Sequence, residues 1–316
     1  MNMRSLGKLL PVIISIGLLV GFAIYLSRNA HRFVTLLNIS PSLLLLAVAL
    51  NLTAFAGNGL INLVLYRHLG AAVIVAEAMS LAAVNTLANL LPFAGGMVAK
   101  GAYLKRKFGL TYTRFLSATV ALFVLMVSTS GAVGLATLAY MRLVLGRDVP
   151  RLLVAGFLVM LLGIAILWLP ASLVPRGRWT ARFEQFLDGW RFVGRRPALL
   201  IMLLLLQLAL MVVLAGRYWT AFHLMSQNVS LADCLLFAAA TVLTQLVTIT
   251  PDGLGIREGI VGGIATLLGF DIGVSVVAVT IDRLVSTAIT IALGSLASYH
   301  LARRLGAHAP AEAERG

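Results

Sequence analysis

The sequence has few charged residues, and this shortage decides the class of protein. Only 11% of the 316 residues are Asp, Glu, Lys or Arg, whereas 60% are hydrophobic. A typical soluble domain carries about 25% charged residues. Uncharged stretches such as Leu43–Leu50 and Leu199–Leu206 would leave a soluble protein without a polar surface. The composition therefore predicts an all-α polytopic membrane protein and excludes a soluble enzyme.

Other absences narrow the function. The only cysteine, Cys234, excludes a disulfide framework and a Cys-rich metal site. The chain contains no phosphate-binding loop of the ATPase type, no His-Glu-x-x-His motif and no serine nucleophile elbow, and its histidines are scattered. The net charge of +14 is spread over many short loops, which favours contact with anionic lipid over a nucleic-acid site. We therefore expect no enzymatic activity, no catalytic residue, no metal, no cofactor and no nucleic-acid partner.

Long apolar runs predict the membrane segments of a single domain covering residues 1–316. The first run is too long for most signal peptides and is expected to be a retained helix. The runs are Leu9–Leu26, Leu43–Leu65, Ile74–Leu91, Phe115–Tyr140, Leu152–Leu169, Ala198–Gly216, Ala232–Ile249 and Gly273–Ala297.

Two further apolar pieces, Gly96–Leu104 and Ile256–Leu268, are too short to span a membrane. Each follows a longer run across a break that contains proline and glycine, where a helix can stop and the backbone can reverse. We therefore expect six full spans and two re-entrant broken hairpins, with eight or more crossings as the alternative.

The distribution of basic residues favours the hairpin topology. With both termini on the cytoplasmic side of the inner membrane, most Lys and Arg lie inside, as the positive-inside rule requires. The side chains expected outside are Arg28, Arg32, Arg142, Arg147, Arg151 and Arg217.

The two halves of the chain also resemble each other. The separation of Pro92 from Phe115 equals that of Pro251 from Val274, and each proline has a glycine four positions later, Gly96 or Gly255. In the hairpin topology this makes an inverted repeat of about residues 43–140 and 198–300. Paired broken segments of this kind indicate the binding site of a transporter. Kinked helices without a transport role are the alternative.

Residues 176–196 lie outside the predicted spans and have an amphipathic pattern. Trp179, Phe183 and Trp190 fall on one helical face, and arginines occupy the other. This pattern predicts an interfacial helix on the inner leaflet, although an ordinary connector would also fit.

Polar residues near the two breaks are the candidate site, because ionisable groups inside a membrane are costly. Arg257 could pair with Asp282, and Glu258 with Arg283, either as a structural clamp or as part of a site for a lipid headgroup. The predicted substrate-binding set is Asn85, Asn89, Pro92, Gly96, Lys100, Pro251, Asp252, Gly253, Gly255, Arg257, Glu258, Asp282 and Arg283.

The motifs Asn89–Gly96, Lys100–Lys105 and Pro251–Glu258 resemble the lysylphosphatidylglycerol synthase transmembrane region. That family includes the flippase part of the multiple peptide resistance factor. The likeness covers about Pro11–His300, with two departures: Met97 stands where the family often has an acid, and Ala121–Val124 replaces an acidic-arginine pair.

The resemblance implies lipid translocation without aminoacylation, because a separate soluble domain performs that transfer in the bifunctional members. We expect a flippase or scramblase-like carrier for a phospholipid or an isoprenoid-type lipid, with membrane lipids as partners through anionic headgroup contacts. The alternative is a non-catalytic membrane subunit that supports a lipid- or glycan-modifying enzyme. A partner enzyme or homo-oligomer is compatible with either.

Overall fold

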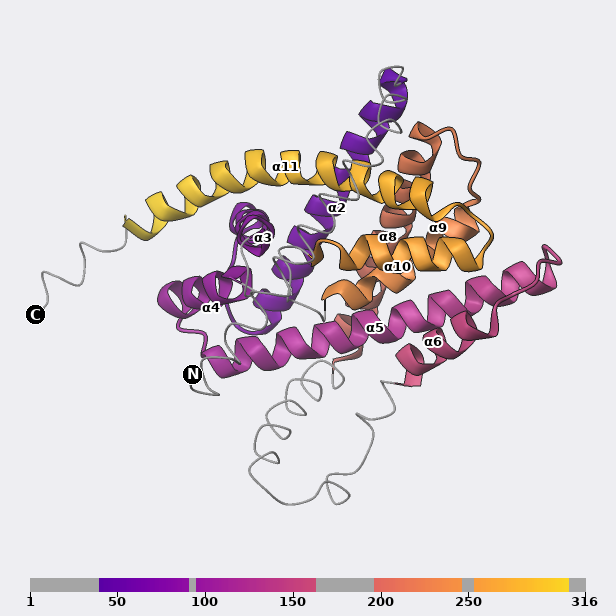
Figure 1. The fold of residues 1–316 in the computed structure, drawn as a ribbon. Coiled ribbons are helices and arrows are strands. Elements are labelled where there is room, and N and C mark those ends of the chain that lie inside the picture. Colours follow the sequence, from indigo (N-terminus) through magenta and orange to yellow (C-terminus); the bar gives the residue numbers. More distant parts are fainter. Residues whose placement is uncertain (1–39, 91–94, 163–195, 246–252, 307–316) are drawn as a thin grey trace, which may run out of the picture.

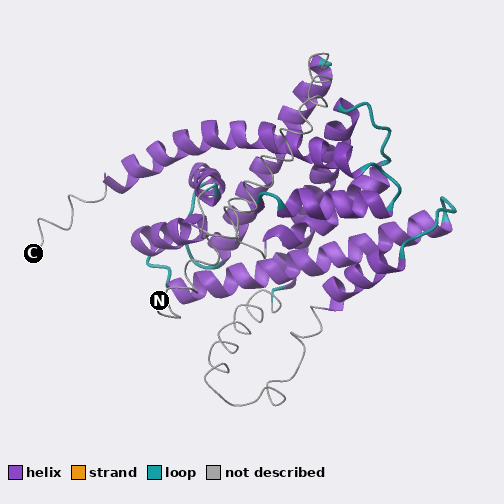
Figure 2. Cartoon of the chain, viewed as in Figure 1, coloured by secondary structure: helices purple, strands orange, loops and turns teal. Residues whose placement is uncertain are grey.

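The computed structural model describes residues 40–90, 95–162, 196–245 and 253–306, which form helices joined by short loops (Figures 1 and 2). No β-strand occurs within these ranges, in agreement with the predicted all-α class. The predicted first helix, Leu9–Leu26, and nearly all of the predicted interfacial helix at 176–196 lie outside the described residues.

Four helices are long and apolar enough to cross a membrane: α2 (Pro41–His68), α5 (Tyr112–Leu143), α8 (Pro197–Leu224) and α11 (Ile272–Gly306). At about 1.5 Å per residue each exceeds the ~30 Å hydrocarbon core of a bilayer. Prolines begin α2 and α8, where the missing N–H group costs no helical hydrogen bond. The chain is therefore a multi-pass membrane protein.

The remaining helices are shorter. They are α3 (Val75–Asn89), α4 (Gly95–Phe108), α6 (Arg151–Leu162), α9 (Leu231–Thr241) and α10 (Ile256–Leu267), with a 3₁₀ turn, η4 (Val242–Gln245), after α9. Glycines with positive φ follow two of them, Gly109 (+67°) after α4 and Gly269 (+89°) after α10. These residues in the left-handed conformation lie where α4 and α10 end.

The apolar run Ala232–Ile249 does not form one continuous α-helix as its hydropathy suggested. The hydroxyl of Thr241 donates to the carbonyl of Ala238 at 3.0 Å, and that of Thr244 to the carbonyl of Thr241 at 2.7 Å. Bonds to a carbonyl three residues back accompany the tighter 3₁₀ turn that begins at Val242.

The helices surround a central region. α5 and α11 run along opposite sides in Figure 1, α9 and α10 lie between them, and α2 crosses this space and extends past α11. α2 packs on α8 and α3, α11 packs on α3, α8 and α10, and α6 packs on α5. In the largest apolar core, Phe222 of α8 stacks on Phe237 of α9 with ring centroids 5.4 Å apart.

Two buried acidic side chains cap the starts of the short helices α3 and α9 and bind basic residues of neighbouring segments. Glu77 accepts from the N–H of Ile74 at the start of α3 and binds Lys107 at the end of α4. Asp233 accepts from the N–H of Ser230 at the start of α9 and pairs with Arg147, 2.9 Å away in the loop after α5. Each acid therefore caps its own helix and ties it to a neighbouring segment.

Candidate functional site

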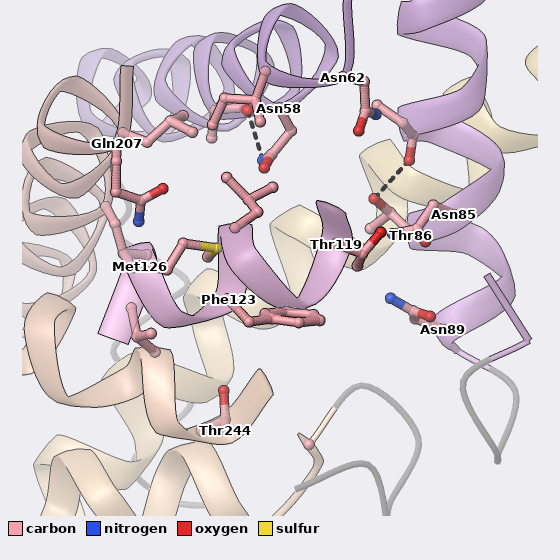
Figure 3. A pocket seen from close by; sticks show the side chains of 18 of the residues that line it. Asn58, Asn62, Asn85, Thr86, Asn89, Thr119, Phe123, Met126, Gln207 and Thr244 are labelled. Atoms are coloured by element: carbon pink, nitrogen blue, oxygen red, sulfur yellow. Dashed lines mark hydrogen bonds between the residues drawn. The ribbon is translucent and has the colours of Figure 1, made fainter. Parts of the chain in front are cut away.

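A cavity of about 390 Å³ lies where the helices of the two halves meet. Residues of α2, α3, α4 and α5 line it from one half, and residues of α8, α9, η4, α10 and α11 from the other. Much of the lining consists of amides and hydroxyls, labelled in Figure 3: Asn58, Asn62, Asn85, Thr86, Asn89, Thr119, Gln207 and Thr244. The volume is within the range of about 300–1,000 Å³ typical of small-molecule sites.

The polar residues predicted at the first break meet in this cavity. Asn85 and Asn89 of α3 line it from positions one helical turn apart, and Lys100 of α4 lies nearby. Gly96 brings α4 against α3, because a Cβ atom there would lie 2.4 Å from the carbonyl oxygen of Asn85 and 2.7 Å from Oδ1 of both asparagines. Glycine is therefore required at Gly96 for the observed approach of the two helices.

Lys100 is a partly buried cation whose neighbours are mostly uncharged. Its Nζ donates to Oδ1 of Asn62 at 3.4 Å, and no carboxylate of the described residues lies within 4.0 Å. A buried charge held only by an amide retains much of its desolvation cost. An anionic group entering the cavity would lower that cost.

The second break contributes residues from the opposite half. Gly253 and Arg257 line the cavity. Gly253 and Gly255 have positive φ of +65° and +83°, so the chain turns sharply before α10. The N–H of Gly255 donates to Oε2 of Glu258 at 2.8 Å, which caps α10. Of the predicted set, Pro92, Pro251 and Asp252 lie outside the described residues.

The two buried carboxylates of α10 and α11 are held in ion pairs. Nη1 of Arg283 donates to Oε1 of Glu258 at 2.5 Å, so the predicted Glu258–Arg283 pair is formed. The expected partner of Asp282 is wrong. Arg217, and not Arg257, binds it through two bonds of 2.8 Å, Nε to Oδ1 and Nη2 to Oδ2.

This second pair also corrects the predicted position of Arg217. The apolar run before it stops at Gly216, which led to its assignment to an outer loop, but α8 continues to Leu224. Arg217 is therefore inside the helix and buried against α11. Glu258, Asp282 and Arg283 do not line the cavity, and their pairs join α10 to α11 and α8 to α11.

The sequence reasoning missed Gln207. This side chain is only 4% exposed, its amide points into the cavity in Figure 3, and its Oε1 has no hydrogen-bond partner within the described residues. An unpaired buried carbonyl oxygen carries a free-energy cost of about 1–3 kcal/mol. Gln207 is the only polar residue in Ala198–Gly216, and this isolation was the signal that could have identified it.

The profile of the lysylphosphatidylglycerol synthase transmembrane region matches residues 9–294, a range that includes both breaks and every residue lining the cavity. The chain belongs to this family. No curated protein matches the chain. The family membership confirms the resemblance seen in the motifs around Pro92 and Pro251. At one of the departures from the family pattern, Met97, the side chain lines the cavity.

Proposed function

We propose that this member of the lysylphosphatidylglycerol synthase transmembrane family moves lipid across the cytoplasmic membrane, as a flippase or scramblase-like carrier for a phospholipid or an isoprenoid-type lipid. The observation that carries the proposal is the polar cavity at the centre of an otherwise apolar set of helices. A polar group inside the membrane carries a free-energy cost, and such groups are retained where a polar substrate passes.

In this mechanism the headgroup enters the cavity while the apolar chains remain in the bilayer. The amides of Asn85, Asn89 and Gln207 replace hydrogen bonds that the headgroup loses when it leaves water. Lys100 and Arg257 face the phosphate from opposite halves of the chain. The ion pairs of Glu258 and Asp282 join α10 and α8 to α11, and Arg257 of α10 lines the cavity.

The mechanism uses the hairpin topology. α3, α4, α9 and α10 have 11 to 15 residues each, which gives lengths of only about 17–23 Å. Helices of this length do not cross a ~30 Å hydrocarbon core alone. We propose that α3–α4 and α9–α10 enter from opposite sides, with both termini cytoplasmic, and that the two breaks face the cavity at mid-depth.

The proposal assigns no enzymatic step to the chain. The test is reconstitution of the purified protein in liposomes that contain a trace of headgroup-labelled phospholipid. An impermeant quencher added outside then reports how fast the label reaches the outer leaflet. We expect movement in proteoliposomes and little in empty liposomes. If well-folded protein gives no movement under any condition, the carrier proposal fails and a non-catalytic subunit of a lipid- or glycan-modifying enzyme is favoured.

Gln207→Leu provides a matched variant for this assay. Leucine is similar in size and removes the unpaired buried amide, so the variant should be at least as stable as the wild type. Transport should nevertheless fall, because the cavity loses a polar contact. Leu205→Ala on the same helix is the control, since Leu205 is 61% exposed and does not line the cavity. Equal transport by Gln207→Leu and the wild type would contradict a role of the cavity.

A further inference from the structure

In the described part of the chain, every charged side chain that lines the cavity is basic. Three basic residues, Lys100, Arg217 and Arg257, line it, and none of the described lining residues is acidic. The charge of Arg217 is balanced by Asp282 behind it. Glu258 and Asp282, which the sequence analysis placed in the candidate headgroup site, do not line the cavity and are bound to Arg283 and Arg217.

The uncharged part of the lining has a second property. Five carboxamides face the cavity, and a carboxamide offers both donors and acceptors. Nδ2 of Asn58 already donates to the carbonyl of Ala54 at 2.9 Å, and its Oδ1 accepts no hydrogen bond from the described residues. The buried Oε1 of Gln207 is also an acceptor without a partner in the described residues. These oxygens can accept hydrogen bonds from a ligand that carries donors.

Together these features define a headgroup chemistry. A phosphate supplies the opposite charge for Lys100, and hydroxyl groups beside it donate to the carboxamide oxygens and accept from their N–H₂ groups. An ammonium group would also donate, but it would lie beside Lys100, and like charges in a region of low dielectric repel strongly.

We propose that the cavity selects phospholipids whose headgroup is anionic and bears hydroxyl groups, such as a glycerol phosphate or a sugar phosphate, over lipids with a cationic headgroup. This inference rests on the proposed function, because it assigns the substrate class to the same cavity. It follows from the charge and amide pattern of this chain.

The experiment measures lipid binding to the purified full chain in detergent by native mass spectrometry, with four probes. Phosphatidylglycerol has a phosphate and hydroxyls, phosphatidic acid has a phosphate without a hydroxylated headgroup, phosphatidylethanolamine has an ammonium group, and lysylphosphatidylglycerol has a net positive headgroup. We expect phosphatidylglycerol to bind at least tenfold more tightly than lysylphosphatidylglycerol, with phosphatidic acid between them. Equal or tighter binding of either amine-bearing lipid would overturn the proposal.

Two variants assign the selectivity to the cavity. Lys100→Met should reduce the preference for anionic lipids, and Gln207→Leu should lower phosphatidylglycerol binding toward the level of phosphatidic acid. Leu205→Ala should leave all four affinities unchanged. Unaltered selectivity in both cavity variants would contradict the assignment. Glycerol phosphate, added as a soluble competitor, tests whether the cavity binds a lipid headgroup or a free phosphate ester. Competition at concentrations similar to those of the lipid would contradict the assignment of a lipid as the ligand.

Binding and transport can fail independently. Selective binding without movement in liposomes would leave the headgroup assignment in place and refute the carrier. Movement at equal rates for all four headgroups would support the carrier and refute the selectivity.

Discussion

Removing one charge of the Glu258–Arg283 pair should destabilise the protein far more than removing both. Glu258 and Arg283 are 2% and 6% exposed, so a single substitution leaves a buried charge without the opposite charge of this pair. Breaking such a pair typically costs about 3–5 kcal/mol. Glu258→Gln together with Arg283→Gln removes both charges, and the glutamine at 258 can still accept from the N–H of Gly255 at the start of α10.

A double-mutant cycle measures this coupling. We expect each single variant to lose about 3–5 kcal/mol of unfolding free energy and the double variant to recover most of it. Neither side chain lines the cavity, so the double variant should also keep its lipid movement. The exposed pair Arg142–Asp148 is the control, and its single variants should unfold almost as the wild type does. Additive losses in the double variant would refute the reasoning, because they would show that the two side chains do not act as a pair.

Three further predictions concern other parts of the structure. Gly96→Ala should lower the free energy of unfolding by about 1–3 kcal/mol and reduce transport, because the new Cβ would meet the carbonyl oxygen of Asn85. A Cβ at Gly263 would have no atom within 4 Å, so Gly263→Ala should be tolerated, and thermal unfolding of both variants checks this. Single cysteines between Lys105 and Arg114, where α4 ends and α5 begins, should resist an impermeant thiol reagent added outside the cell, and labelling there would contradict the hairpin topology. Trp179→Ser with Trp190→Ser should weaken transport without unfolding the spans, because an aromatic side chain of the predicted interfacial helix would lose burial worth about 1–3 kcal/mol. Unchanged transport would indicate that the segment is an ordinary connector.

Hydropathy and breaker residues were enough to locate most of the helices. α2, α5, α8 and α11 fall on predicted apolar runs, because a bilayer imposes long apolar segments whatever the fold. The breaks were also foreseeable, since proline and glycine act through local backbone geometry. The boundaries were less accurate: Arg217 follows an apolar run directly, and composition alone did not show that α8 continues past it.

Contacts between helices were harder to predict, because they depend on how each helix is rotated against its neighbours. The partner of Glu258 was predicted correctly as Arg283, but the pairing of Asp282 with Arg217, 65 residues away, has no local signal. The cavity gathers side chains from both halves, including Asn62 and Gln207, which lie in different predicted spans. A single sequence does not show which polar residues of separate helices face one another.

The central claim is that a lipid headgroup occupies the cavity at mid-depth. The most direct measurement is photolabelling of the reconstituted protein with phosphatidylglycerol that carries a photoreactive group on its headgroup, followed by mapping of the labelled peptides. The account predicts label on the stretch of α5 that contains Thr119, Phe123 and Met126, which line the cavity in Figure 3, and not at the outward-facing Leu205 of α8. Label confined to the loops and helix ends would contradict it.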